Sequence, residues 1–102
     1  MIARIWHGMT RAEHYDAYWA FLQERAIPDY RGTPGNLGVR LFRRREGDRA
    51  HFLCLSYWPS LEAIRAFAGD DIDRAKYYPE DRDYLLEFEP TVLHYDVTGA
   101  PE

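Results

Sequence analysis

The chain of 102 residues is 46% hydrophobic, 16% aromatic and 29% charged, a composition typical of a globular protein with one core rather than of a disordered or fibrous chain. Acidic residues outnumber basic residues 17 to 13, and the formal net charge of -4 argues against a nucleic acid partner, because phosphate binding needs a basic surface. No apolar run approaches the roughly 20 residues of a membrane span, and no signal-peptide pattern begins the chain. We therefore expect no membrane association and a cytoplasmic location.

The N-terminal third predicts a strand and a helix. Residues 2–7 form a short apolar run typical of a strand, which ends at Gly8. Thr10 and Glu13 match a capping box, in which the hydroxyl and the carboxylate each bond a free backbone N–H at a helix start. We expect the helix to stop before Pro28, whose ring disfavours helical geometry at the preceding residue. Its buried face recurs at helical spacing and comprises Ala12, Tyr15, Trp19, Leu22 and Ala26.

The middle of the chain predicts a hairpin. After an irregular loop, strands over 37–44 and 50–58 flank a tight turn at 46–48. The basic run 43–45 is expected to be a solvated strand end that discourages edge pairing, with anion binding as the alternative. Cys54, the single cysteine, excludes an intrachain disulfide and is expected to be a buried, inert thiol.

The last third predicts a second helix and a fourth strand. Ser60 is the expected N-cap of this helix and Gly69 its end. A further short helix is expected over 70–75 and a strand over 87–97. The buried face of the second helix comprises Leu61, Ile64, Phe67 and Ala68.

Both faces of the predicted sheet carry bulky side chains. Along the last strand, Val92 and His94 lie on one side and Leu93 on the other. Two helices can cover only one face of a four-stranded antiparallel sheet, so we expect an identical subunit to cover the second face. The sequence therefore predicts an α+β, ferredoxin-like βαββαβ domain over 1–102, with 98–102 as a loose tail, that forms a homodimer.

Three segments, IARIWHG at 2–8, SYWPSLEA at 56–63 and FAGDD at 67–71, together resemble the antibiotic biosynthesis monooxygenase family over nearly the whole chain. The resemblance implies a dimeric α/β barrel of ferredoxin-like subunits, with a ligand cavity between the sheet and the helices of each subunit. Relatives use this cavity for cofactor-free oxidation of polyketide quinols, haem degradation, isomerisation or cyclisation.

The haem-degrading branch of the family uses an asparagine near the end of strand one, a tryptophan in helix two and a histidine that ligates the iron. The matching positions here are His7, Phe67 and Tyr77. Because the histidine and the tryptophan are replaced, the resemblance does not extend to haem cleavage. A tyrosine can ligate haem iron in other proteins, so haem binding through Tyr77 stays an alternative.

His7 and His94 are the candidate catalytic bases, because an imidazole exchanges protons near neutral pH. We expect them to share one pocket wall, since strands one and four lie side by side in this fold. Tyr77 is a third candidate catalytic residue, whose phenol can donate a hydrogen bond to a ligand oxygen. The alternatives are a structural hydrogen bond for each histidine and simple packing for the tyrosine. His14 and His51 are expected to be exposed.

Trp6, Trp58, Phe67 and Tyr78 are the candidate substrate-binding residues. The first three can stack on a planar aromatic molecule, and the phenol of Tyr78 can bond one of its oxygens. Packing in the core or in a dimer interface is the alternative reading of large aromatic side chains in a small domain.

No metal, nucleotide or other cofactor is predicted. Asp70, Asp71, Glu80 and Asp81 lack the spacing of a metal site and are expected to cap helices or face solvent. The segment 32–35 lacks the lysine and the strand-to-helix setting of a phosphate loop. The predicted function is that of a cofactor-independent oxygenase, in which a histidine deprotonates a phenolic or quinol substrate that then reacts with O2. The alternatives are an isomerase or cyclase on the same cavity, and a haem-binding or non-catalytic ligand-binding dimer.

Overall fold

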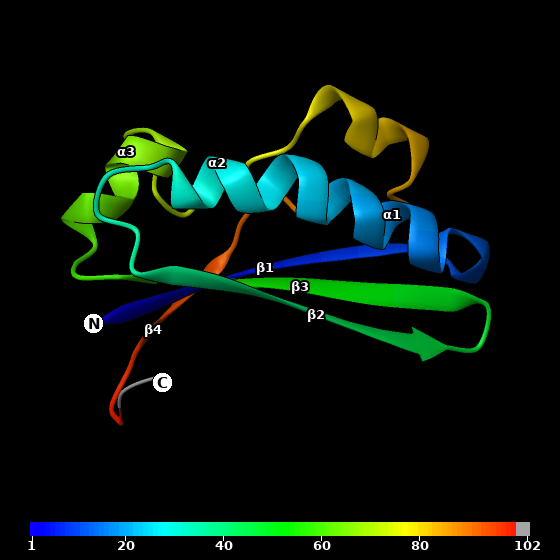
Figure 1. Ribbon diagram of the computed structural model, residues 1–102, viewed down its shortest axis with the longest axis horizontal. Coiled ribbons are helices and arrows are strands. Elements are labelled where there is room, and N and C mark those ends of the chain that lie inside the picture. The colour runs from blue at the N-terminus through cyan, green and yellow to red at the C-terminus, as the bar shows by residue number, and fades with distance from the viewer. Residues whose placement is uncertain (100–102) are drawn as a thin grey trace.

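The computed structural model describes residues 1–99, which contain one four-stranded antiparallel sheet in the order β2-β3-β1-β4. β1 is paired with β3 along its whole length, from Ile2 opposite Trp58 to Arg11 opposite Arg49. Figure 1 shows these long strands side by side below the helices. The strands are β1 (Ile2–Arg11), β2 (Gly38–Glu46), β3 (Arg49–Trp58) and β4 (Leu93–Asp96).

The helical segments of the described chain lie on one face of this sheet (Figure 1). With the sheet order, this confirms the predicted α+β, ferredoxin-like fold. Among the described residues, no helix combines the length and the hydrophobicity that a membrane crossing requires. The helical segments are η1 (Ala12–His14), α1 (Tyr15–Phe21), the π-helical η2 (Leu22–Ala26), α2 (Ile27–Arg31), η3 (Glu62–Ile64), α3 (Arg65–Ala68) and η4 (Pro79–Asp83).

Side chains alternate between the two faces of the sheet along β1 and β3. Trp6, Phe52 and Cys54 point toward the helices and are buried. His7 and Leu53, which lie opposite one another in the register, point to the other side. We call that side, which carries no helix in the described part of the chain, the uncovered face. The core under the helices comprises Trp6, Tyr18, Leu22, Ala26, Tyr30, Val39, Ala50, Phe52, Cys54, Trp58, Ile64, Phe67, Leu85 and Val92.

The first strand is longer than expected, and the predicted capping box is wrong. Thr10 lies in β1 opposite Ala50, is fully buried, and donates its hydroxyl to the carbonyl of Arg11 at 2.9 Å. Glu13 accepts a bond from the side chain of Arg11 at 2.8 Å. Pairing with β3 keeps Thr10 extended, so its hydroxyl is not available to cap a helix.

The first helical segment does not stop at Pro28 but continues to Arg31. Just before the proline, the backbone N–H of Ile27 bonds the carbonyl of Leu22, five residues back, in a π-helical turn. A widened turn gives the ring space, and proline has no N–H to leave unpaired. The predicted helix end before Pro28 is therefore wrong, because the π-helical turn accommodates the proline and the helix continues.

The hairpin predicted over 37–58 is confirmed as β2 and β3, and Gly47 in its turn has a positive φ of 58°. The hydroxyl of Ser60 accepts a bond from the backbone N–H of Ala63 at 3.2 Å, as predicted for the start of the second helix. Gly69, with φ of 88°, ends this helix as expected, because a side chain would strain that backbone.

The short helix expected over 70–75 is absent from the described structure. Arg74 instead forms an isolated β-bridge with Thr91, and the backbone N–H of Val92 bonds the carbonyl of Asp73 at 2.8 Å. The aspartates at the start of this segment match an N-cap pattern, but pairing with a distant extended segment overrides that local preference.

The fourth strand is shorter than the predicted range 87–97 and covers Leu93–Asp96. Before it, the backbone N–H of Leu86 bonds the carbonyl of Met9 in β1 at 2.9 Å. Between Leu86 and Leu93 the chain leaves the edge of β1 and then returns to it as β4. The tail expected at 98–102 has its last three residues outside the described part of the chain.

A buried carboxylate joins η4 to the first helix. Asp81 accepts a bond from the hydroxyl of Tyr18 at 2.7 Å and one from the backbone N–H of Tyr78 at 2.6 Å. Asp81 and Tyr18 are both buried. Burial raises the pKa of Asp81 and that of Tyr18. As predicted, Asp81 caps a helix, because its carboxylate bonds the N-cap backbone of η4, but the expectation that it faces solvent is wrong.

We expect Asp81→Ala to lower the free energy of unfolding by about 3 kcal/mol, because two buried donors lose their acceptor. Asp81→Asn should cost clearly less, since its amide oxygen can accept from the backbone and its NH2 can donate to the tyrosine oxygen. Urea denaturation of both variants measures the difference. Equal losses in the two variants would contradict a role for these hydrogen bonds.

Candidate functional site

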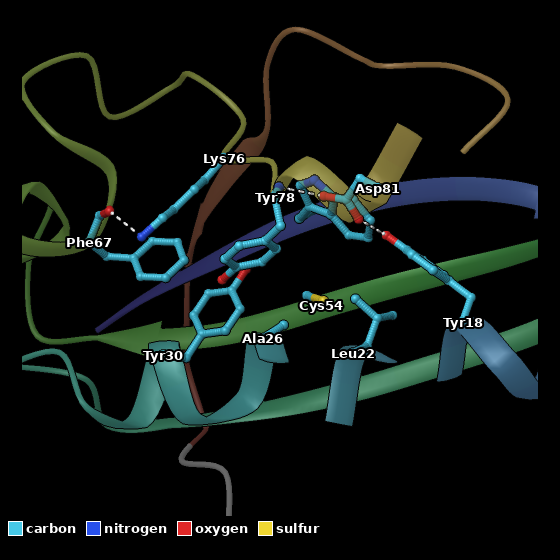
Figure 2. A pocket seen from close by; sticks show the side chains of 10 residues that line it. Tyr18, Leu22, Ala26, Tyr30, Cys54, Phe67, Lys76, Tyr78 and Asp81 are labelled. Atoms are coloured by element: carbon cyan, nitrogen blue, oxygen red, sulfur yellow. Dashed lines mark hydrogen bonds between the residues drawn. The ribbon is translucent and has the colours of Figure 1, made fainter. Parts of the chain in front are cut away.

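A pocket lies between the sheet and the helices, where the sequence predicts a ligand cavity. It encloses only about 10 Å³, which is about the room that one water molecule needs. Figure 2 shows how its side chains converge from the helices, β3 and the segment before η4. Its lining residues are Trp6, Tyr18, Leu22, Ala26, Tyr30, Cys54, Phe67, Lys76, Tyr78 and Asp81, which include three of the four predicted substrate-binding residues.

Paired polar and aromatic groups close this interior pocket. The rings of Tyr30 and Phe67 stack with centroids 4.3 Å apart, and Nζ of Lys76 lies 4.3 Å from the ring of Phe67 (Figure 2). Asp29 binds that ammonium at 2.9 Å and accepts a bond from the hydroxyl of Tyr78 at 2.5 Å. Burial and the bond to Asp29 raise the pKa of Tyr78. A planar aromatic ligand could enter only if these contacts opened.

Trp58, the fourth predicted substrate-binding residue, belongs to the core and does not line the pocket. It is fully buried, its Nε1–H donates to the hydroxyl of Ser56 at 2.9 Å, and its ring lies 6.0 Å from that of Phe67. These contacts give Trp58 a packing role. Burial raises the pKa of Cys54 to about 12, as expected for an inert thiol.

His7 lies on the uncovered face, at the centre of a chain of four hydrogen-bonding groups. Its Nδ1 contacts the carboxylate of Glu89, and its Nε2 lies 2.9 Å from Nδ1 of His51. Nε2 of His51 in turn lies 3.0 Å from a carboxylate oxygen of Glu46. We call these four residues the relay. Register places His7 and His51 on the same face, because β1 and β3 are paired and their side chains alternate in step.

The two imidazole rings meet end to end. Their centroids are 5.2 Å apart and their planes differ by 26°, while the facing nitrogens are only 2.9 Å apart. Rings stacked face over face do not bring two ring atoms so close, so a proton lies between the nitrogens. In residues 1–99, no group of three His, Cys, Asp or Glu side chains is placed to hold a metal ion.

The relay holds more protons than two neutral imidazoles can supply. An ionised carboxylate can only accept hydrogen bonds, so Nδ1 of His7 and Nε2 of His51 each carry a proton. The bond between the rings needs a third proton. Three hydrogen bonds thus need three protons, and with both carboxylates ionised the third proton would make one imidazole cationic and leave the relay with a net charge of minus one. Hydrogen bonds from His51 and Arg44 lower the pKa of Glu46, which keeps that end of the relay negative.

A second pocket of about 230 Å³ opens beside the relay on the uncovered face. Phe42 and Leu53 give it apolar walls, and Arg44 gives it a positive charge next to the two imidazoles. Such a combination favours a flat apolar molecule with one ionisable oxygen. The pocket is lined by His7, Phe42, Arg43, Arg44, His51 and Leu53.

His94 lies on the opposite face from His7, so the expectation that they share one pocket wall is wrong. His94 is paired with Arg4 in the register of β4 and β1, and directly paired residues share a face. Arg4 lies on the helix side, with its guanidinium 5.5 Å above the ring of Phe67. Nδ1 of His94 contacts Asp73 at 3.0 Å. Burial and the charge of Arg4 lower the pKa of His94, and Asp73 opposes this shift.

Tyr77 lies next to the relay and lines neither the interior pocket nor the pocket beside the relay. Its hydroxyl donates to the backbone carbonyl of Glu89 at 2.5 Å, and its ring makes an edge contact with Trp6 at 6.1 Å. Burial and nearby Glu89 raise the pKa of Tyr77 to about 12. The geometry supports a role in positioning Glu89, the carboxylate behind His7.

Sequence reasoning missed three of the four relay residues. His51 was expected to be exposed, and Glu46 was assigned to a turn. The register of the first strand against the hairpin is the signal that would have placed His51 beside His7. Glu89 lies between the Leu86 contact and β4, in a segment with no regular pattern, so the sequence offers no comparable signal for it.

Solved structures similar to this chain include a crystal structure of an antibiotic biosynthesis monooxygenase, with 19% identity, a TM-score of 0.66 and coverage of 97% of this chain and 100% of that one. Another is a MhuD mutant with two manganese protoporphyrin IX molecules bound per active site, with 18% identity, a TM-score of 0.62 and coverage of 100% and 99%. At these identities the similarity establishes the fold, and it agrees with the fold implied by the sequence segments. No protein-family model and no curated protein sequence matches the chain.

A porphyrin does not fit the interior pocket of this chain. The space of about 10 Å³ admits no macrocycle. The hydroxyl of Tyr77, which the sequence resemblance matches to an iron-ligating histidine of haem-degrading proteins, already donates to the carbonyl of Glu89. The residues present therefore give no support to the haem-binding alternative.

We expect His94 to make the protein less stable in mild acid. Its pKa is lowered on folding, so as pH falls through about 6.5 the unfolded chain takes up a proton before the folded chain does. The free energy of unfolding therefore decreases toward acid. Thermal melts between about pH 7.5 and pH 5.5 should show a smaller loss for His94→Gln than for the wild type. A loss of the same size in both proteins would contradict the effect of burial.

Proposed function

We propose that the chain is a homodimeric enzyme of the antibiotic biosynthesis monooxygenase family that oxidises a small phenolic or quinol substrate without a metal or flavin. The observation that carries this proposal is the position of His7, whose imidazole is backed by Glu89 and opens on a pocket of about 230 Å³. The fold shared with a monooxygenase of known structure agrees with it. The substrate would bind at the uncovered face rather than between sheet and helices.

In this proposal His7 acts as the general base. It takes the proton of the substrate hydroxyl, and Glu89 stabilises the imidazolium that forms. Phe42 and Leu53 hold the aromatic ring, and the charge of Arg44 favours the anion. The electron-rich substrate anion then reacts with O2. One oxygen atom becomes a carbonyl oxygen on a ring carbon that loses its hydrogen, and the other leaves as water with that hydrogen and the hydroxyl hydrogen, so a phenol becomes a quinone and the substrate itself is the reductant.

The first test follows oxygen consumption with a panel of phenols and quinols. We expect turnover by the wild type and a loss of about 100-fold or more in His7→Gln, because general base catalysis contributes that much. Glu89→Gln should lose less, since it keeps a hydrogen-bond acceptor for the ring. His14→Gln is the matched control, because that histidine contacts Tyr84 on the helix side of the molecule.

Wild-type turnover in His7→Gln, with its fold confirmed by circular dichroism, would contradict the proposal. Conversion of a substrate by His7 without oxygen uptake would instead support the isomerase or cyclase alternative, which uses the same base. The oxygen electrode therefore separates the two reactions directly.

The homodimer is proposed from the exposed apolar side chains of the uncovered face. Phe42, Leu53, Leu93 and Tyr95 are 45%, 36%, 59% and 51% exposed, and all lie on the side of the sheet without helices. Contiguous apolar surface of this kind marks a site of association. A second copy packed on this face would also form the outer wall of the pocket beside the relay.

Light scattering tests the dimer. We expect the wild type to have twice the mass of the chain and Leu93→Glu to be monomeric, because a charge at the interface stays unpaired. Leu61→Glu is the matched control, since that leucine is also exposed but lies at the start of the second helix. A monomeric wild type, or two variants that behave alike, would overturn this part of the proposal.

A further inference from the structure

We propose that His51 and Glu46 complete a clamp that holds the ionisable oxygen of the substrate between the two imidazoles. In this arrangement Nε2 of His7 and Nδ1 of His51 separate, and the substrate oxygen takes the place of their direct hydrogen bond. The inference rests on the proposed function and extends it, because it assigns the site a second imidazole and a substrate class.

The first support is the placement of the facing nitrogens. Both His7 and His51 line the pocket of about 230 Å³, whereas Glu46 and Glu89 do not. Every other ring nitrogen of the pair is already bonded to a carboxylate. A ligand can therefore engage these imidazoles only at the bond that joins them.

The second support is the charge of the pair. The relay carries one proton more than two neutral imidazoles, and Arg43 and Arg44 also line the pocket. The relay as a whole stays negative because of its two carboxylates, but these bond the far ring nitrogens and do not line the pocket, whereas the imidazoles and the arginines do. The groups that face a bound molecule therefore favour an oxygen that becomes negative.

The third support is the donor and acceptor pattern. A hydroxyl can donate to one imidazole while it accepts from the other, and its conjugate anion can accept from both. A ketone can only accept, and a carboxylate has no proton to give. The clamp therefore selects phenols, quinols and enols.

Proton transfer in the clamp needs no further reactant. On binding, the shared proton stays on Nδ1 of His51, which is cationic and backed by Glu46, while Nε2 of His7 is unprotonated. The substrate O–H bond then breaks, its proton bonds to Nε2 of His7, and the electron pair stays on oxygen. The resulting oxyanion accepts a hydrogen bond from each imidazolium, and each imidazolium is balanced by its own carboxylate.

The test uses 4-nitrophenol, which absorbs visible light only as the phenolate. Titration of the wild-type protein at several pH values gives the affinities of the phenol and of the phenolate. We expect the phenolate to bind about tenfold more tightly or better, because a hydrogen bond to a charged group contributes that much. His51→Gln should lose most of this preference, and Glu46→Gln should lose part of it.

His14→Gln is the control that should keep the wild-type preference, because its side chain lies outside the pocket. Glu46→Gln keeps an acceptor for the His51 ring, so it reports on the clamp even if His51→Gln does not fold. An equal affinity of the wild type for phenol and phenolate overturns the clamp. So does a wild-type preference in both His51→Gln and Glu46→Gln.

The outcomes separate the clamp from the proposed oxidation. Phenolate preference that depends on His51, with no oxygen consumed for any phenol or quinol, supports the clamp and contradicts the oxidation. Oxygen consumption that depends on His7 but is unchanged in His51→Gln supports the oxidation and overturns the clamp.

Discussion

The pairing of β1 with β3 over ten residues determines which side chains can meet on each face of the sheet. With this register, Trp6 joins the core under the helices, and His7, the next residue, points to the uncovered face beside His51. A shift of one residue would exchange the two faces. The buried core and the relay therefore depend on the same hydrogen-bonded strand pair, and neither could move without the other.

The two faces differ in how their polar groups are satisfied. Between sheet and helices, charges and phenols pair with each other, as Asp29 does with Lys76 and Tyr78, and leave almost no free space. On the uncovered face, the relay lies beside an open pocket, and one hydrogen bond joins its two imidazoles. Paired groups in a buried network hold one another in place, whereas a hydrogen bond between two imidazoles beside a pocket can be exchanged for one to a ligand. This contrast is why we place the chemistry on the uncovered face.

Much of the fold could be predicted because it follows from local patterns. Strand alternation, the Ser60 cap and the positive φ of Gly69 each need only a few neighbouring residues. The errors arose where local sequence preference does not determine the backbone conformation. Pairing with β3 holds Thr10 extended, and a π-helical turn lets the helix continue through Pro28. Within the candidate site, the sequence singles out His7 by its residue type and by the predicted strand end, although β1 continues to Arg11. The sequence does not single out its partners. The register of β1 and β3 places His51 beside His7, and Glu89 lies in a segment without regular secondary structure.

We infer that the two imidazoles of the relay share one proton between two carboxylates. Nitrogen NMR of the wild-type protein, labelled at histidine, tests it most directly. We expect three of the four ring nitrogens of His7 and His51 to carry a proton at neutral pH, with a coupling between Nε2 of His7 and Nδ1 of His51 across the hydrogen bond. Two independent neutral rings, with one protonated nitrogen each and no coupling between them, would contradict the account.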